Sequence, residues 1–209
     1  MNRDLKGQRV YLVVFMLTLI ALCITVVINF QPLYYFFVDH HHLANNVGLS
    51  RPELVKNYQH LLNYLNFPWV TSLHMSLPSS ADGLTHFADV KHLFLLNYAI
   101  LIVGAPFSWV YLKTLKQHNT LWKLIAPAQM VLTGVILLVI IMLLSFQQFF
   151  ITFHEVLFRN QDWVFDAVKD PIINALPDNF FLACFIMFFS LFCAALISMI
   201  VIGKRSLSK

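Results

Sequence analysis

Four long apolar stretches constrain the fold of this 209-residue chain more than any other feature. They run from Val10 to Phe30, from Leu93 to Leu112, from Leu124 to Phe146 and from Phe180 to Gly203. Each contains about the 20 mostly apolar residues that a helix needs to cross a lipid bilayer. Only 11% of the residues are charged, whereas soluble domains typically carry about 25%. The sequence therefore predicts an all-α integral membrane protein built as a four-transmembrane-helix bundle.

The charges between these stretches predict the orientation of the chain. The two termini and segment 113–123 together hold nine of the 14 basic residues and a single acid, Asp4, while segments 31–92 and 147–179 hold five basic and nine acidic residues. Basic residues near the ends of transmembrane helices mark the cytoplasmic side. We therefore expect cytoplasmic N- and C-termini and two outer segments. Because the net charge of +4 reflects topology, no nucleic-acid partner is expected, and residues 1–209 are predicted to form a single membrane domain.

The two outer segments carry helical patterns of their own. Apolar residues recur at steps of three and four from Arg51 to Leu65, which predicts an amphipathic helix. Ser50 and Glu53 are placed to form a capping box at its start, and Pro68 ends the pattern. Segment 147–179 is rich in aromatic residues, which suit the lipid headgroup layer. We expect the outer segments to form a helical extracellular cap.

Two histidines lie near the outer ends of the apolar stretches. His86 precedes Leu93 by seven residues, so on a continuous helix it lies about 10 Å beyond the apolar stretch. His154 follows Phe146 by eight residues, which is about 12 Å along a continued third helix. Both depths match the headgroup layer, where lipid ester bonds lie. We regard His86 and His154 as candidate catalytic residues; the alternative is that each is only a polar anchor at the interface.

Charged residues near these histidines are candidates for a supporting role. Asp89 is three residues from His86 and shares its helix face. Its carboxylate can orient the imidazole, or the two residues can form an ordinary solvated pair. A second cluster follows His154 and comprises Arg159, Trp163, Asp166 and Asp170. These residues either support the site or brace the loop among themselves.

The residue patterns leave two functions open in addition to catalysis by the two histidines. The nine histidines allow a metal-dependent membrane hydrolase. However, Phe158 stands where an H-E-x-x-H motif beginning at His154 requires its second histidine, and we expect neither a metal nor another cofactor. A non-catalytic receptor or assembly factor is the other alternative, with the cap as its binding surface. No strongly ionisable residue lies deep in a span, which counts against an ion-coupled transporter.

Two stretches of the chain resemble the bacterial lipoprotein intramolecular transacylase family. They are GLTHFADVKHLF, from Gly83 to Phe94, and FHEVLFRNQDWVFDAVKDPIINALPDNFF, from Phe153 to Phe181. The four-span layout also matches, so the resemblance covers essentially the whole chain. It implies a diacylglyceryl-modified lipoprotein substrate, whose sn-2 acyl chain moves to the α-amine of its N-terminal cysteine. The product is an N-acylated lyso-form lipoprotein, and the histidines implied to be catalytic are His86 and His154.

The candidate histidines fit this chemistry. Ester and amine belong to the same molecule, so no enzyme nucleophile is required and positioning can supply much of the rate. The α-amine must lose a proton, which a histidine with a pKa near 6.5 can accept. A second histidine can protonate the leaving glyceryl oxygen or stabilise the oxyanion. The sequence leaves open which histidine has which role. We further expect membrane lipid as a partner, a monomer, and a site on the extracellular side of the bacterial cell membrane.

Overall fold

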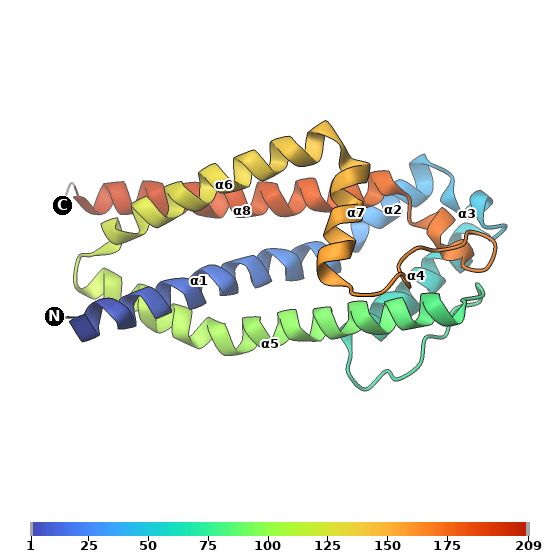
Figure 1. The fold of residues 1–209 in the computed structure, drawn as a ribbon, viewed down its shortest axis with the longest axis horizontal. Coiled ribbons are helices and arrows are strands. Elements are labelled where there is room, and N and C mark those ends of the chain that lie inside the picture. Colours follow the sequence, from blue (N-terminus) through green and yellow to red (C-terminus); the bar gives the residue numbers. More distant parts are fainter. Residues whose placement is uncertain (1, 208–209) are drawn as a thin grey trace. The chain divides into compact units, whose positions relative to one another are not determined.

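The computed structural model describes residues 2–207, with side chains described from residue 7 onward. Residues 1, 208 and 209 and the side chains of residues 2–6 lie outside the described part. They include four residues of the charge count above: Arg3, Asp4, Lys6 and Lys209. Every regular element within residues 2–207 is helical (Figure 1). In chain order these elements are α1 (Asn2–Asn29), α2 (Gln31–His40), α3 (Leu43–Asn46), α4 (Arg51–Asn66), α5 (Ala81–Gln117), η1 (Leu121–Leu124), α6 (Ile125–Leu144), α7 (Phe146–Leu157), η2 (Pro171–Ala175) and α8 (Asp178–Leu207).

Four of these helices are long and apolar enough to cross a membrane. The segments are Gly7–Asn29, Ala81–Gln117, Leu121–Leu144 and Asp178–Leu207, and each contains one of the predicted spans almost entirely. The prediction of an all-helical protein with four transmembrane helices is confirmed. With 37 residues, α5 is about 55 Å long, more than the roughly 30 Å of a bilayer's hydrocarbon core. The part of α5 that precedes Leu93 therefore extends beyond the apolar layer.

The chain divides into two compact units. Unit 1 contains the described residues up to Val27, together with Asn97–Ser145 and the part of α8 from Phe185 onward. Its helices approach closely through small and polar residues: a Cβ at Gly104 would lie 2.1 Å from Oγ1 of Thr18. Asn97 of α5 donates a hydrogen bond of 2.9 Å from Nδ2 to Oγ1 of Thr25 of α1. Such contacts between small and polar residues are typical of helix packing within a bilayer.

Unit 2 consists of Ile28–Leu96 and Phe146–Cys184, and it carries the candidate site. Tyr34, Leu54 and Ile172 are fully buried at the centre of its apolar core. The amphipathic helix predicted between the first two spans is α4, and the predicted capping box between Ser50 and Glu53 is present. The prediction that these segments are helical is thus confirmed, although residues 159–170 contain no helix. That residues 1–209 form a single membrane domain stays a prediction.

The third apolar stretch does not continue as one helix to His154, contrary to the extrapolation made from the sequence. α6 ends at Leu144, and Ser145 has an extended backbone with φ −156° and ψ 93°. α7 then begins at Phe146 as a separate helix. An extended residue breaks the hydrogen-bond ladder of a helix, so the rise per residue along α6 cannot be carried over to α7. The distance of about 12 Å expected for His154 therefore does not apply.

Candidate active site

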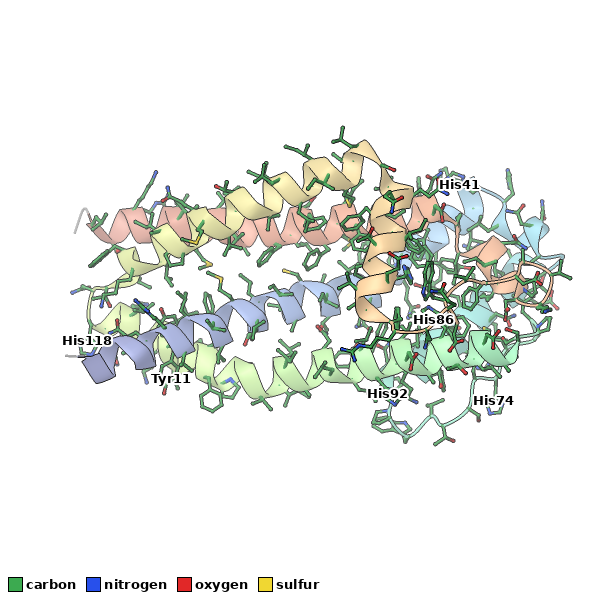
Figure 2. All side chains as sticks on the ribbon, viewed as in Figure 1. Tyr11, His41, His74, His86, His92 and His118 are labelled. Carbon is green, nitrogen blue, oxygen red and sulfur yellow. The ribbon has the colours of Figure 1, made fainter. Side chains whose placement is uncertain are left out.

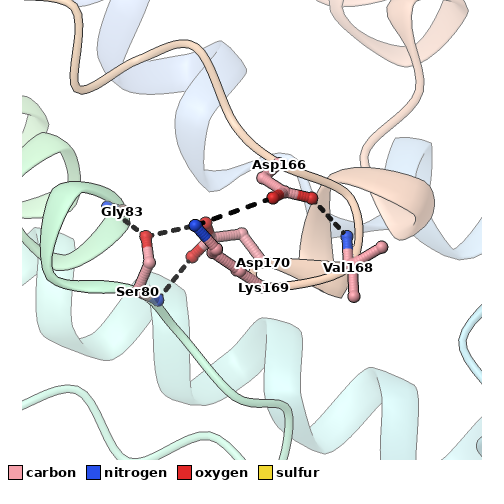
Figure 3. Close-up of polar contacts among 6 residues, drawn as sticks. All are labelled: Ser80, Gly83, Asp166, Val168, Lys169 and Asp170. Carbon is pink, nitrogen blue, oxygen red and sulfur yellow. Dashed lines mark hydrogen bonds and ion pairs between the residues drawn. The ribbon is translucent and has the colours of Figure 1, made fainter.

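The N-terminus of α5 is held by a buried carboxylate. Ser80 precedes the first helical residue, and its Oγ accepts a hydrogen bond of 3.0 Å from the backbone N of Gly83. Asp170 is 2% exposed and accepts two hydrogen bonds of 2.7 Å, from the backbone N and from Oγ of Ser80 (Figure 3). Negative charge is favourable at a helix N-terminus because the backbone amides there are unpaired. Asp170 thereby fixes the segment between α7 and η2 to the start of α5.

His86 lies six residues after Ser80, which is about 9 Å along α5, and it is surrounded by aromatic rings. Its side chain is buried, and its ring meets Phe158 at 4.8 Å and Phe165 at 5.4 Å between centroids, both edge to face. Nδ1 of His86 is buried and makes no hydrogen bond within the described part of the chain. Buried polar atoms without a partner are rare in native structures. This nitrogen is therefore available to a bound substrate.

His154 is placed by α7 and has a defined tautomer when neutral. Its Nδ1 lies 2.7 Å from the backbone O of Phe150, one turn earlier in the helix. Because a carbonyl oxygen can only accept, Nδ1 carries the hydrogen, and the lone pair of the neutral ring is on Nε2. The ring is packed against Phe150 at 4.2 Å and stacked on Trp163 at 5.0 Å between centroids. These contacts hold the imidazole in one orientation.

The two histidine rings lie next to each other. Their centroids are 5.9 Å apart with an angle of 39° between the planes. Figure 2 shows His86 on the side of α5 that faces α7, with His92 of the same helix pointing away. His86 and His154 are 7% and 9% exposed, respectively, so the pair is almost closed off from solvent. Two side chains 68 positions apart thus form one buried imidazole pair.

Burial lowers the pKa of both histidines. His86 precedes the apolar part of α5, and its pKa is lowered to about 4, mainly by burial and further by the charge of His154. The carboxylate of Asp89 acts in the opposite direction. For His154, burial lowers the pKa, while the hydrogen bond to Phe150 raises it. Desolvation disfavours the charged form of an imidazole, so both rings are neutral near pH 7.

Asp89 is bound by Asn160 and not by His86. Its Oδ2 accepts a hydrogen bond of 3.0 Å from Nδ2 of Asn160. The backbone O of Asn160 in turn accepts a hydrogen bond of 3.1 Å from Nε1 of Trp163, the ring that stacks on His154. Asp89 therefore influences His86 through its charge, and it is linked to His154 through Asn160 and Trp163.

The remaining candidate residues lie at the edge of the site. Asp166 is exposed, and its Oδ1 accepts a hydrogen bond of 2.9 Å from the backbone N of Val168. Its carboxylate also forms an ion pair of 3.9 Å with Lys169 (Figure 3). Arg159 is exposed and forms no ion pair with any described residue. Both side-chain contacts of Asp166 are thus made within residues 166–169 of the same loop.

The described residues contain no group of three or more His, Cys, Asp and Glu side chains that could hold a metal ion. The candidate site instead offers two imidazoles surrounded by aromatic rings. Of these rings, sequence reasoning assigned a supporting role only to Trp163, and it assigned none to the amide of Asn160. The abundance of aromatic residues in segment 147–179 was the available signal, but it indicates the headgroup layer equally well.

Comparison with known proteins identifies the family of the chain. The family model described as lipoprotein intramolecular transacylase Lit matches residues 9–181. The chain belongs to the Lit family. Members of this family are acyltransferases that act on lipoproteins, so the sequence-based predictions of the family and of an acyltransferase are confirmed. A comparison with curated proteins gave no match.

Solved structures of Lit share the fold. The membrane integral Lit from Bacillus cereus is 24% identical, covers 97% of both chains and has a TM-score of 0.88. A variant of that protein with arginine in place of a histidine is 25% identical, with a TM-score of 0.79 over 99% of this chain and 96% of the other. A second variant, with alanine in place of a histidine, is 24% identical and has a TM-score of 0.80 over 100% and 98%. The chain is thus a multi-pass membrane protein with the Lit fold.

Proposed function

We propose that this Lit-family chain uses His86 and His154 to move the sn-2 acyl chain of a diacylglyceryl lipoprotein to the α-amine of its N-terminal cysteine. The observation that carries this proposal is the pair itself: two neutral, buried imidazoles in contact, one with a fixed tautomer and one with an unpartnered nitrogen. The transfer requires proton movement and charge stabilisation, and the pair offers one group for each.

His154 acts as the general base and then as the general acid. Its Nε2 carries the free lone pair, because Nδ1 donates to Phe150. This nitrogen takes a proton from the α-amine as the amine attacks the ester carbonyl. It then returns the proton to the glyceryl oxygen as that oxygen leaves, so one C–N bond forms, one C–O bond breaks, and no net proton is consumed. Proton transfer by a positioned side chain contributes about 10²–10⁴-fold in rate.

His86 stabilises the oxyanion of the tetrahedral intermediate as a hydrogen-bond donor. Its pKa of about 4 keeps the ring neutral, and a neutral imidazole can polarise a carbonyl without giving up its proton. The partnerless Nδ1 supports this role, because an unused buried nitrogen gains a hydrogen bond when substrate is present. Removal of one such donor typically costs about 10²–10³-fold in rate.

Asp89, Trp163 and Asp170 position the pair in this scheme. Asp89 tunes His86 through its charge, Trp163 holds the ring of His154, and Asp170 fixes the aromatic loop to α5. Arg159 and Asp166 lie at the exposed edge, where Asp166 braces the loop through Val168 and Lys169. The monomeric state, and action on lipid and substrate without a metal or other cofactor, stay predictions from the sequence.

The basic residues at the two termini and in segment 113–123 support a cytoplasmic location for these regions. The site then faces the extracellular side of the bacterial membrane, where the lipidated end of a secreted lipoprotein lies. This orientation is tested in intact cells by introducing a cysteine at exposed Asp166 and adding a membrane-impermeant thiol reagent. Labelling in intact cells is expected. Labelling only after the cells are opened would show that the site faces the cytoplasm.

The chemical roles are tested by a set of substitutions at the two histidines. The rate of conversion of a synthetic diacylglyceryl lipopeptide to its lyso form is measured for His86→Ala, His86→Gln, His154→Ala and His154→Gln. Glutamine retains an N–H donor but cannot take up a proton near neutral pH. We therefore expect His86→Gln to retain more activity than His86→Ala, and His154→Gln to be as inactive as His154→Ala.

His92→Ala is the matched control, because His92 lies exposed on the same helix. It should match the parent chain in rate and in thermal unfolding. The proposed roles are reversed if glutamine rescues position 154 and not position 86. They are wrong altogether if both alanine variants retain the activity of the control.

A further inference from the structure

The segment between α4 and α5 carries an exposed aromatic pair, which we call the aromatic tip (Phe67–Trp69). Phe67 is 41% exposed and Trp69 is 74% exposed. Their rings stack with centroids 5.0 Å apart, with Pro68 between them. The tip belongs to unit 2 and takes no part in the histidine site. Adjoining large apolar side chains that stay exposed mark a surface that contacts something other than water.

Two contacts fix the depth of the tip along the apolar helices. On one side of the tip, Nδ2 of Asn66 donates a hydrogen bond of 3.3 Å to Oδ1 of Asn29, the last residue of α1. On the other side, Nζ of Lys91 donates a hydrogen bond to the backbone O of Val70. Lys91 stands two residues before Leu93, where the apolar part of α5 begins. Both neighbours of the tip are thus tied to the ends of apolar helical stretches.

Lys91 holds this segment firmly. Its side chain is only 8% exposed, and Nζ lies 4.3 Å from the centre of the Tyr64 ring. A buried ammonium group needs partners, and here they are a carbonyl oxygen of the segment and an aromatic face of α4. The tip is therefore presented at a fixed level.

We propose that the aromatic tip is a membrane anchor that inserts into the lipid headgroup layer at the outer ends of α1 and α5. Tryptophan is favoured in this layer because its ring is apolar while its N–H can be hydrated or bonded to headgroups. A protein partner would also suit an exposed aromatic pair, but the level of Asn29 and Lys91 favours lipid. The anchor sets the depth of the site, since His86 lies about 7–8 Å beyond Lys91 on the same helix.

The proposal is tested by tryptophan fluorescence of the full chain in lipid vesicles. The emission of Trp69 is obtained as the difference between the parent chain and Trp69→Phe, which leaves the site untouched. Quenching is compared for lipids brominated near the headgroup end of the acyl chain, for lipids brominated near its terminus, and for aqueous iodide. Trp109→Phe is the matched control, because Trp109 is 72% exposed within the apolar part of α5.

We expect the Trp69 emission to be quenched most strongly by bromine near the headgroup end and only weakly by iodide. The Trp109 emission should be quenched by brominated lipid and not by iodide, which shows that the assay reports on lipid contact. Strong quenching of Trp69 by iodide, with no effect of brominated lipid, would overturn the proposal and favour a protein partner as the ligand of the aromatic tip. This result is independent of the histidine chemistry, because neither tryptophan touches the pair.

Discussion

Substitution of Gly83 by alanine is expected to destabilise unit 2 and to lower acyl-transfer activity. The added methyl group would lie 2.4 Å from Oδ1 and 3.0 Å from Cγ of Asp170. These distances are too short for non-bonded contact, so the carboxylate must give up its two hydrogen bonds to Ser80. Hydrogen bonds to a charged group contribute about 1.5–3 kcal/mol each, while alanine in a helix recovers about 1 kcal/mol relative to glycine. The net loss is therefore about 2–5 kcal/mol.

The free energy of unfolding is measured by denaturant titration in detergent micelles, alongside the rate of lyso-lipopeptide formation. Gly134→Ala is the matched control, because it also lies within a helix and its new Cβ would meet no atom within 4 Å. This control should be as stable as the parent chain or slightly more stable. In an Asp170→Ala background the carboxylate is absent, so Gly83→Ala should stabilise the chain by about 1 kcal/mol through helix propensity. The double-mutant cycle should therefore show a coupling of about 3–6 kcal/mol, which is the contribution of the two hydrogen bonds.

Two outcomes would refute this reasoning. Gly83→Ala could prove as stable as Gly134→Ala, which would mean that the carboxylate of Asp170 does not pack against Gly83. Alternatively, Gly83→Ala could cost the same with and without Asp170, which would place the conflict elsewhere, for instance at Phe165, whose Cε1 would lie 3.2 Å from the new Cβ.

Three further predictions concern the surroundings of the pair. Asn160→Ala removes the donor to Asp89 and should cost about 1.5–3 kcal/mol in unfolding titrations; a cost near zero would show that this bond is unimportant. The folded-state pKa of His86, about 4, lies below its unfolded value near 6.5. Its contribution to stability is therefore complete above pH 6.5 and lost as the pH falls toward 4, by up to about 3 kcal/mol; unfolding titrations across this range should show a shallower decline for His86→Gln. Trp163→Phe keeps a ring against His154 and should retain more transfer activity than Trp163→Ala, and equal rates would argue against a positioning role for this stack.

The spans and α4 could be predicted because their signals are local. Hydropathy marks about 20 consecutive residues, and the capping box of Ser50 and Glu53 needs only residues three apart. The break at Ser145 gave no such signal, because apolar residues continue on both sides of it. Neither proline nor glycine marks this position, so the extended conformation of one serine could not be read from the pattern.

The candidate site shows the same limit. His86 and His154 stood out because each lies near the end of an apolar stretch. Their surroundings depend on pairings between distant residues: Asn160 binds Asp89 across 71 positions, and Asp170 binds Ser80 across 90. A single sequence gives no information about such pairings. The spacing of Asp89 and His86 left open whether the carboxylate orients the imidazole or forms an ordinary solvated pair with it. In the structure the carboxylate accepts a hydrogen bond from Asn160, to which the sequence assigned no role.

The role of the histidine pair is tested most directly by mass spectrometry of the N-terminus of one diacylglyceryl lipoprotein after incubation with purified protein in lipid vesicles. The parent chain and His92→Ala should both convert the substrate to the N-acylated lyso form. The double variant His86→Ala/His154→Ala, folded as judged by its thermal unfolding, should leave the diacylglyceryl group intact and the amine free. Conversion by the double variant at the parent rate would contradict catalysis by this pair.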